Sequence, residues 1–121
     1  MLKGSVIKNI PWIDIMVAWD TIVKVQSVIV DTGFTGKLWL TPPLASELGL
    51  NIVGVTLVKM ADGKTSPISI ANIFVTLEKS LKLVPVFVSE GAPLLGMGLL
   101  SEFGCRAIID CPSQSVEIIE K

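Results

Sequence analysis

Apolar and polar residues alternate along most of the chain, and this period of two is typical of half-buried β-strands. The alternating runs are short, and glycine, proline, asparagine or aspartate residues separate them. The pattern predicts about nine strands, at residues 2–7, 12–19, 22–30, 37–40, 51–60, 64–77, 81–88, 105–110 and 115–119. We find no internal repeat, low-complexity tract or linker, and therefore expect one mostly-β domain over residues 1–121.

Two segments depart from this alternation and predict short helices. Thr41 is a plausible N-cap before two prolines, which the first turn of a helix tolerates, and Gly49 is placed to end that helix. Residues 97–103 form the second predicted helix, with Leu99, Leu100 and Phe103 facing inward. Between the strands at 51–60 and 64–77, Ala61-Asp62-Gly63 has the chemistry of a hairpin turn. Pro67 predicts that part of the second strand lies at a sheet edge.

The stretch from Val28 to Gly36 combines a buried strand with a carboxylate. Val28-Ile29-Val30 reads as a fully buried strand, and it delivers Asp31 to the edge of a dry core. A carboxylate at such a place is costly unless it is hydrogen-bonded, paired or protonated. Gly33 and Gly36 allow a sharp turn and a close backbone approach. The stretch is suited to holding one carboxyl group in a fixed position, although an Asx-type turn that merely closes a strand has the same sequence requirements.

Composition narrows the classes of function. Half of the residues are apolar and the mean hydropathy is +0.69, yet no uncharged apolar run is long enough to span a bilayer. The first five residues also lack the apolar core of a signal peptide. We therefore expect no membrane span and a cytoplasmic protein. The apolar excess suggests a buried interface between subunits.

Charge and residue usage exclude several kinds of site. The net charge is −1, there is no basic patch and tyrosine is absent, which disfavours nucleic-acid binding. The absence of histidine excludes a Ser-His-Asp triad and a histidine-ligated metal, and we expect neither a metal nor a cofactor. Cys105 and Cys111 lack the spacing of a zinc or redox motif. Two reduced thiols are the favoured interpretation, and a bridge across a hairpin is the alternative.

Three motifs in order resemble the small retroviral-type (retropepsin-like) aspartic proteases, especially their prokaryotic members. These motifs are the Asp31-Thr32-Gly33 loop, the Ala61-Asp62-Gly63 hairpin, and Leu94-Leu95-Gly96 followed by a short helix. The resemblance covers roughly residues 5–119. It implies a closed acid-protease-like β-barrel, with one lobe per chain. It also implies an aspartic endopeptidase that acts on extended peptide.

The resemblance also assigns roles to individual residues. Peptide hydrolysis by this chemistry needs one ionised and one protonated carboxyl, about 3 Å apart, and a two-fold homodimer supplies the second Asp31. Thr32 would hydrogen-bond across the two-fold axis, and Gly33 would admit the substrate backbone. The residues implied to contact substrate, including a flap tip at residues 60–63, are Phe34, Thr35, Met60, Ala61, Asp62, Gly63, Leu95 and Gly96.

Some residues depart from the family pattern or fit a plainer interpretation. Phe34 stands where retroviral enzymes usually carry alanine, and its bulk raises the question of how wide the substrate cleft is. Leu38-Trp39 resembles a Leu-Trp pair in pepsin-like chains but lies one position further along. The hairpin at 61–63 also fits an ordinary exposed turn. The alternative functions are a non-catalytic peptide-binding or assembly module, which Phe34 favours, and a plain structural barrel.

Overall fold

Ten strands form one continuous sheet in the computed structural model, which describes residues 1–121. The strands are β1 (Leu2–Ile7), β2 (Ile10–Trp19), β3 (Ile22–Asp31), β4 (Leu38–Leu40), β5 (Ile52–Lys59), β6 (Thr65–Leu77), β7 (Ser80–Val88), β8 (Leu94–Gly96), β9 (Cys105–Asp110) and β10 (Ser115–Glu120). The two helices are α1 (Pro42–Leu48) and α2 (Met97–Glu102). The prediction of a mostly-β chain with two short helices is confirmed.

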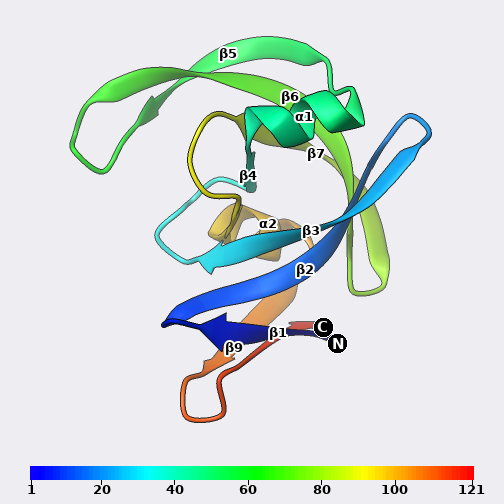
Figure 1. Ribbon diagram of the computed structural model, residues 1–121, viewed down its shortest axis with the longest axis vertical. Coiled ribbons are helices and arrows are strands. Elements are labelled where there is room, and N and C mark those ends of the chain that lie inside the picture. Colours follow the sequence, from blue (N-terminus) through cyan, green and yellow to red (C-terminus); the bar gives the residue numbers. More distant parts are fainter.

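The sheet closes on itself because β2 pairs with β6 as well as with β3. The ring runs β2-β3-β8-β4-β7-β6 and forms a closed barrel of six strands, as the acid-protease-like fold requires. β5 extends the sheet beyond β6, and the strands β1, β10 and β9 extend it beyond β2. Figure 1 shows β5 and β6 arching over one end of the molecule, while β1 and β9 lie at the other end beside both termini.

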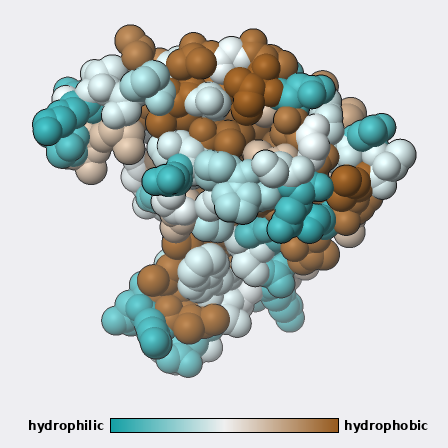
Figure 2. Space-filling view, turned by 45° about the horizontal axis from the view of Figure 1, so that its top comes forward, coloured by the Kyte–Doolittle hydropathy of each residue, from teal (hydrophilic) through white to brown (hydrophobic).

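The barrel interior is built from apolar side chains. Along β2, Ile13, Ile15 and Val17 are at most 1% exposed, and the residues between them face outward. This is the alternation of a strand with one face in the core. Each such side chain contributes roughly 1.5–3 kcal/mol when it leaves water. Apolar side chains also remain on the outer surface (Figure 2).

Both helices form where the sequence predicts, and α2 ends at Glu102, one residue earlier than expected. Gly49 has a φ of 71°, a left-handed conformation that glycine adopts at little cost, and its N–H donates to the Ser46 carbonyl (3.0 Å). Thr41 occupies the N-cap position of α1, but its side chain makes no capping hydrogen bond. In α2 the two leucines Leu99 and Leu100 are buried, and Phe103 follows them into the core.

Three details of the sequence interpretation need correction. β2 begins at Ile10 and includes Pro11, which pairs with Val6 of β1 and lies beyond the segment paired with β3. Leu94–Gly96 forms a tenth strand, since a three-residue segment is too short to show periodicity. Ile29 is only half-buried, so the run before Asp31 is not fully buried as predicted. Pro67 does lie at an edge, because it pairs with β5 and β7 begins to pair only at Ser69.

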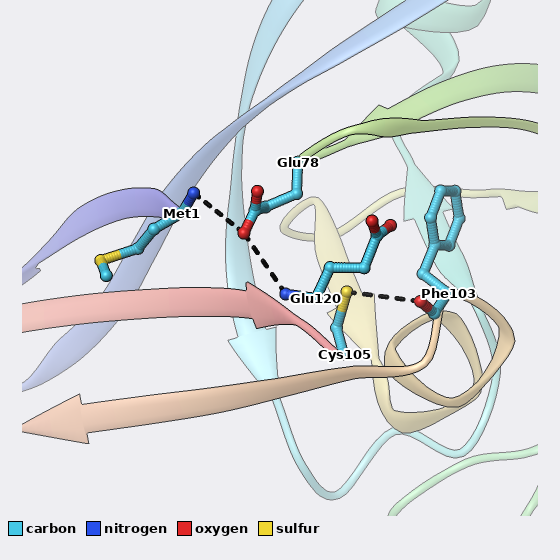
Figure 3. A network of polar contacts seen from close by, with 5 residues as sticks. All are labelled: Met1, Glu78, Phe103, Cys105 and Glu120. Carbon is cyan, nitrogen blue, oxygen red and sulfur yellow. Dashed lines mark hydrogen bonds and ion pairs between the residues drawn. The ribbon is translucent and has the colours of Figure 1, made fainter.

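A polar network joins three distant segments beside the chain ends (Figure 3). The Glu78 side chain is 7% exposed. Its carboxylate forms an ion pair with the Met1 ammonium (2.9 Å) and accepts a hydrogen bond from the Glu120 N–H (3.4 Å). The hydrogen bond from the ammonium is the main cause that lowers the pKa of Glu78. Nearby, burial raises the pKa of the Cys105 thiol, whose Sγ contacts the Phe103 carbonyl. Cys105 and Cys111 are both free thiols.

We predict that Glu78→Gln weakens the fold at neutral pH but not in acid. Because the folded state lowers the pKa of Glu78, the carboxylate stabilises the fold fully above its ordinary pKa. That stabilisation is lost as the pH falls through the lowered pKa of Glu78 in the folded protein. Denaturant unfolding should therefore show that the variant loses less free energy of unfolding, relative to wild type, at about pH 3 than at pH 7.

The matched control for this prediction is Glu47→Gln. Glu47 forms an exposed ion pair with Lys24, and such pairs contribute about 0–1 kcal/mol. A Glu78→Gln deficit that is equal at both pH values would contradict the assignment of the stabilisation to the ionised carboxylate.

Candidate functional site

Asp31 is the last residue of β3, and β8 holds that end of the strand in place. β3 and β8 run parallel, with Val30 beside Leu95 and Asp31 beside Gly96. β8 also pairs with β4 on its other side, so it lies between the strands that flank the Asp31 loop. Val30 and Leu95 are 4% and 0% exposed. The carboxylate therefore emerges directly from the core of the barrel.

The loop folds tightly around the carboxylate. The Gly33 N–H donates to Asp31 Oδ1 (2.9 Å), and the Phe34 N–H donates to the Asp31 carbonyl (3.2 Å). This is the geometry of an Asx turn, so that interpretation of the tripeptide holds locally. It does not exclude chemistry, because the bond engages one carboxylate oxygen and leaves Oδ2 for another partner.

Three backbone hydrogen bonds fasten the loop to β8 and α2. The N–H of Met97 donates to the Phe34 carbonyl (2.8 Å), that of Gly98 to Gly36 (3.0 Å), and that of Gly96 to Lys37 (3.0 Å). They satisfy N–H groups at the start of α2 that have no partner within the helix. The loop therefore has little freedom to move relative to the barrel.

The fastening requires glycine at two positions. A Cβ on Gly96 would lie 2.2 Å from the Gly36 carbonyl oxygen and 2.6 Å from that of Phe34. A Cβ on Gly98 would lie 2.8 Å from the Thr35 carbonyl oxygen. These would be collisions with backbone atoms, which cannot rotate out of the way as a flexible side chain can. The sequence Leu-Leu-Gly-Met-Gly thus supplies the close approach that the loop needs.

A pocket of about 320 Å³ opens above the carboxylate. Its lining comes from the Asp31 loop with Trp39, the β5–β6 hairpin, and the loop before β8. The lining residues are Asp31, Gly33, Phe34, Trp39, Val58, Lys59, Met60, Ala61, Glu90, Gly91, Ala92 and Leu94. The walls of this pocket are mostly apolar, and its charged residues are Asp31, Lys59 and Glu90.

Aromatic packing fixes the side chain of Phe34 at one wall. Its ring centroid lies 6.1 Å from that of Trp39 and 5.9 Å from that of Phe87, at tilted to perpendicular angles that favour aromatic pairs. The Trp39 indole N–H donates to the Ser89 and Glu90 carbonyls (3.2 and 3.3 Å), which ties the 89–93 loop to β4. Phe34 therefore belongs to a fixed wall, and the pocket remains open beside it.

The structure brings some of the predicted site residues together and separates others. Asp31, Gly33, Phe34, Met60 and Ala61 line the pocket. The predicted residues that lie outside its lining are Thr32, Thr35, Asp62, Gly63, Leu95 and Gly96.

Each of the separated residues has a different position. Thr35 is exposed, and Leu95 is buried beneath the loop that Gly96 contacts. Asp62 accepts a hydrogen bond from the Lys64 N–H (2.9 Å) and shapes the tip of the hairpin together with Gly63. Thr32 faces away from the pocket and lines a separate depression with residues of α2 and β9.

Sequence reasoning missed seven lining residues: Trp39, Val58, Lys59, Glu90, Gly91, Ala92 and Leu94. Two of these residues stand in motifs that the sequence shows: Trp39 in the Leu38-Trp39 pair, and Leu94 in Leu94-Leu95-Gly96. Glu90 stands in none, and only the path of the 89–93 loop brings it to the pocket. Glu90 and Lys59 give the pocket one further acid and one base beside Asp31.

No group of three or more histidine, cysteine, aspartate or glutamate side chains is arranged to hold a metal ion. Neither helix has the length and apolar character that crossing a membrane requires.

The barrel and its loop define an acid-protease-like fold, and a solved structure has the same architecture. A crystal structure of a retropepsin-like aspartic protease from Rickettsia conorii matches with a TM-score of 0.60 and 21% sequence identity. The match covers 94% of this chain and 84% of that one. At this identity the likeness shows a shared fold. No family model matches the chain, and no curated protein sequence matches it.

We predict that Gly96→Ala destabilises the protein by about 3 kcal/mol, because the added methyl group collides with two backbone carbonyls. Gly54→Ala is the matched control, since a Cβ there meets nothing within 4 Å, and its effect should stay within about 1 kcal/mol. Urea unfolding measures both. Equal effects would show that the loop can retreat from β8 and is not clamped.

Proposed function

We propose that the chain is an aspartic endopeptidase whose two catalytic carboxyls are Asp31 from each of two identical subunits. The main support is the position of Asp31: a carboxylate at the base of a peptide-sized pocket, in a loop clamped to the barrel. The shared fold with a retropepsin-like aspartic protease is consistent with this role.

The second carboxyl has to come from outside the chain. Asp14, Asp20, Asp62 and Asp110 do not line the pocket. Glu90 does, but it is an exposed residue of the 89–93 loop and makes no hydrogen bond to Asp31. A two-fold axis beside the loop would place an identical carboxyl in an identical clamp, with no second motif in the sequence.

The chemistry then follows from one shared proton. Two carboxyls about 3 Å apart cannot both ionise, so one keeps its proton and the pair titrates as a unit. The ionised carboxyl takes a proton from water as the water oxygen attacks the scissile carbonyl, and the protonated carboxyl donates to the carbonyl oxygen. The proton taken from water then passes to the leaving amine as the C–N bond breaks, and a hydroxyl of the diol intermediate returns its proton to the other carboxyl as the C=O bond reforms. Activity should fall as rising pH removes the shared proton.

The β5–β6 hairpin would act as the flap. Its tip is shaped by the bonds Met60 N–H to Lys64 carbonyl (2.8 Å) and Gly63 N–H to Met60 carbonyl (2.9 Å). Met60 and Ala61 line the pocket opposite Asp31. Closure of this hairpin over a bound peptide would exclude water from the reaction.

We infer that the partner docks on the face that carries Thr32. Thr32 shares its depression with Cys105, Arg106 and Ala107 of β9, and β9 is an open edge of the sheet. The terminal strands β1 and β10 each pair on both sides within the same chain, so neither is free to interleave with a partner. The β9 edge, with exposed Ile108 and Ile109, is the free surface beside the loop.

Asp31→Asn tests the proposal. The amide keeps the shape of the side chain but cannot carry the shared proton, so cleavage of unfolded casein at mildly acid pH should fall by roughly 10²–10⁴-fold. Asp20→Asn is the matched control, since Asp20 lies in the exposed β2–β3 turn, and it should keep full activity. If the protein instead only binds peptides, wild type will be as inactive as the variant and insensitive to pepstatin.

Mixed assemblies test whether the site is shared. A wild-type and an Asp31→Asn chain would form one site with a single carboxyl, which should be inactive. With free subunit exchange at fixed total protein, the initial rate should follow the square of the wild-type fraction. A linear decline would mean that each chain carries a complete site.

A further inference from the structure

The outer surface of the barrel carries a second apolar area, away from the pocket. Four neighbouring strands, in the order β3-β2-β6-β7, present it. In one cross-strand row Val23, Ala18, Phe74 and Leu83 are successive partners. In the next row Val25, Met16, Thr76 and Leu81 are successive partners. Residues paired in this way point to the same face of a sheet, so these side chains form one continuous surface.

Six of these side chains are exposed to an unusual degree for large apolar residues. Their exposed fractions are 45% for Met16, 61% for Val23, 66% for Val25, 38% for Phe74, 62% for Leu81 and 52% for Leu83. We call these six residues the outer patch. None of its members lines the Asp31 pocket or the Thr32 depression.

Polar residues lie at two borders of the outer patch, Trp19 stacks on its member Phe74 (ring centroids 6.1 Å apart), and its two rows contain no charge. Asp14 and Ser27, the next outward pair on β2 and β3, hydrogen-bond to each other at one border. Asp20 and Asn72 lie beyond the other row. A large uncharged patch with a polar rim is typical of a surface that another molecule covers. The absence of charge also means that the patch can face a copy of itself without repulsion.

We propose that the outer patch is a self-association surface, on which the same four strands of a second copy pack face to face around a two-fold axis. Six large side chains at these exposed fractions present on the order of 500 Å² of apolar surface. Two copies together would bury about 1,000 Å², which reaches the lower bound for a specific interface. Two sheets can pack in this way at about 10 Å, as in a β-sandwich.

This interface is separate from the one proposed at the Asp31 loop. A chain with two different two-fold interfaces forms a closed tetramer when the two axes cross at right angles, and an open chain of dimers when they do not. The outer patch should therefore at least double the mass of the dimer that the Thr32 face makes.

Val25→Glu tests the proposal by sedimentation equilibrium across a wide range of protein concentration. Val25 lies on β3, an outer strand of the patch, so the glutamate brings an unpaired charge against the apolar face of the partner. The dissociation constant should rise at least tenfold, and the mass at high concentration should fall to half or less. Val53→Glu is the matched control. Val53 is 60% exposed, as Val25 is to a similar degree, but it lies on β5, outside the four strands that carry the outer patch. It should leave the assembly unchanged.

A milder double variant distinguishes a loss of association from a loss of folding. Val25→Thr with Leu83→Thr keeps β-forming residues on the strands while removing apolar surface, and should also weaken association. Circular dichroism confirms that each variant is folded. The proposal is wrong if wild type and Val25→Glu have the same mass at every concentration. It is also wrong if wild-type protein does not self-associate through the patch and instead binds phosphatidylcholine vesicles in a Val25-dependent way.

Discussion

The close backbone contact between the Asp31 loop and the β8–α2 segment is the constraint on which the site depends. Gly96 and Gly98 let this segment approach the carbonyls of residues 34–36, and three hydrogen bonds then fix the loop. The barrel can bring a carboxylate out of a dry core only because the turn satisfies it locally, through the Gly33 N–H. Precision at Asp31 is therefore a property of the supporting strand as much as of the motif itself. A proton shared between two carboxyls needs such precision, since their interaction weakens steeply with separation.

The sequence predicted the strands well because period-two alternation persists through nearly every segment, and β2 illustrates this with Ile13, Ile15 and Val17 inward. The resemblance named both the Asp31 loop and Leu94-Leu95-Gly96 among its motifs, and the structure pairs the two segments as the parallel strands β3 and β8. Short or irregular features were harder. β8 has three residues and shows no period, and Pro11 is tolerated within β2 because of an edge position that only the fold reveals.

The pocket could be predicted only in part. Asp31, Phe34 and Met60 line one cavity, and their roles in catalysis and substrate contact stay predictions. Glu90 reaches the same cavity through a loop whose path depends on the Trp39 indole N–H, a long-range bond that leaves no local pattern. Thr32 faces the opposite side of the loop from the pocket, toward β9. Its position agrees with a role between subunits, and its assignment to the interface stays a prediction. The apolar excess of the composition has a physical counterpart in the exposed strand faces.

The central claim is that two Asp31 carboxyls share one proton across a two-fold axis. A crystal structure of the assembled protein, determined near the pH of greatest activity, measures this directly. We expect two Asp31 loops to face each other through Thr32, with carboxyl oxygens of the two chains about 3 Å apart. An assembly in which the two carboxyls lie more than roughly 10 Å apart, or a monomer that cleaves peptide with Asp31 alone, would contradict the account, since charges so far apart in water cannot hold a common proton.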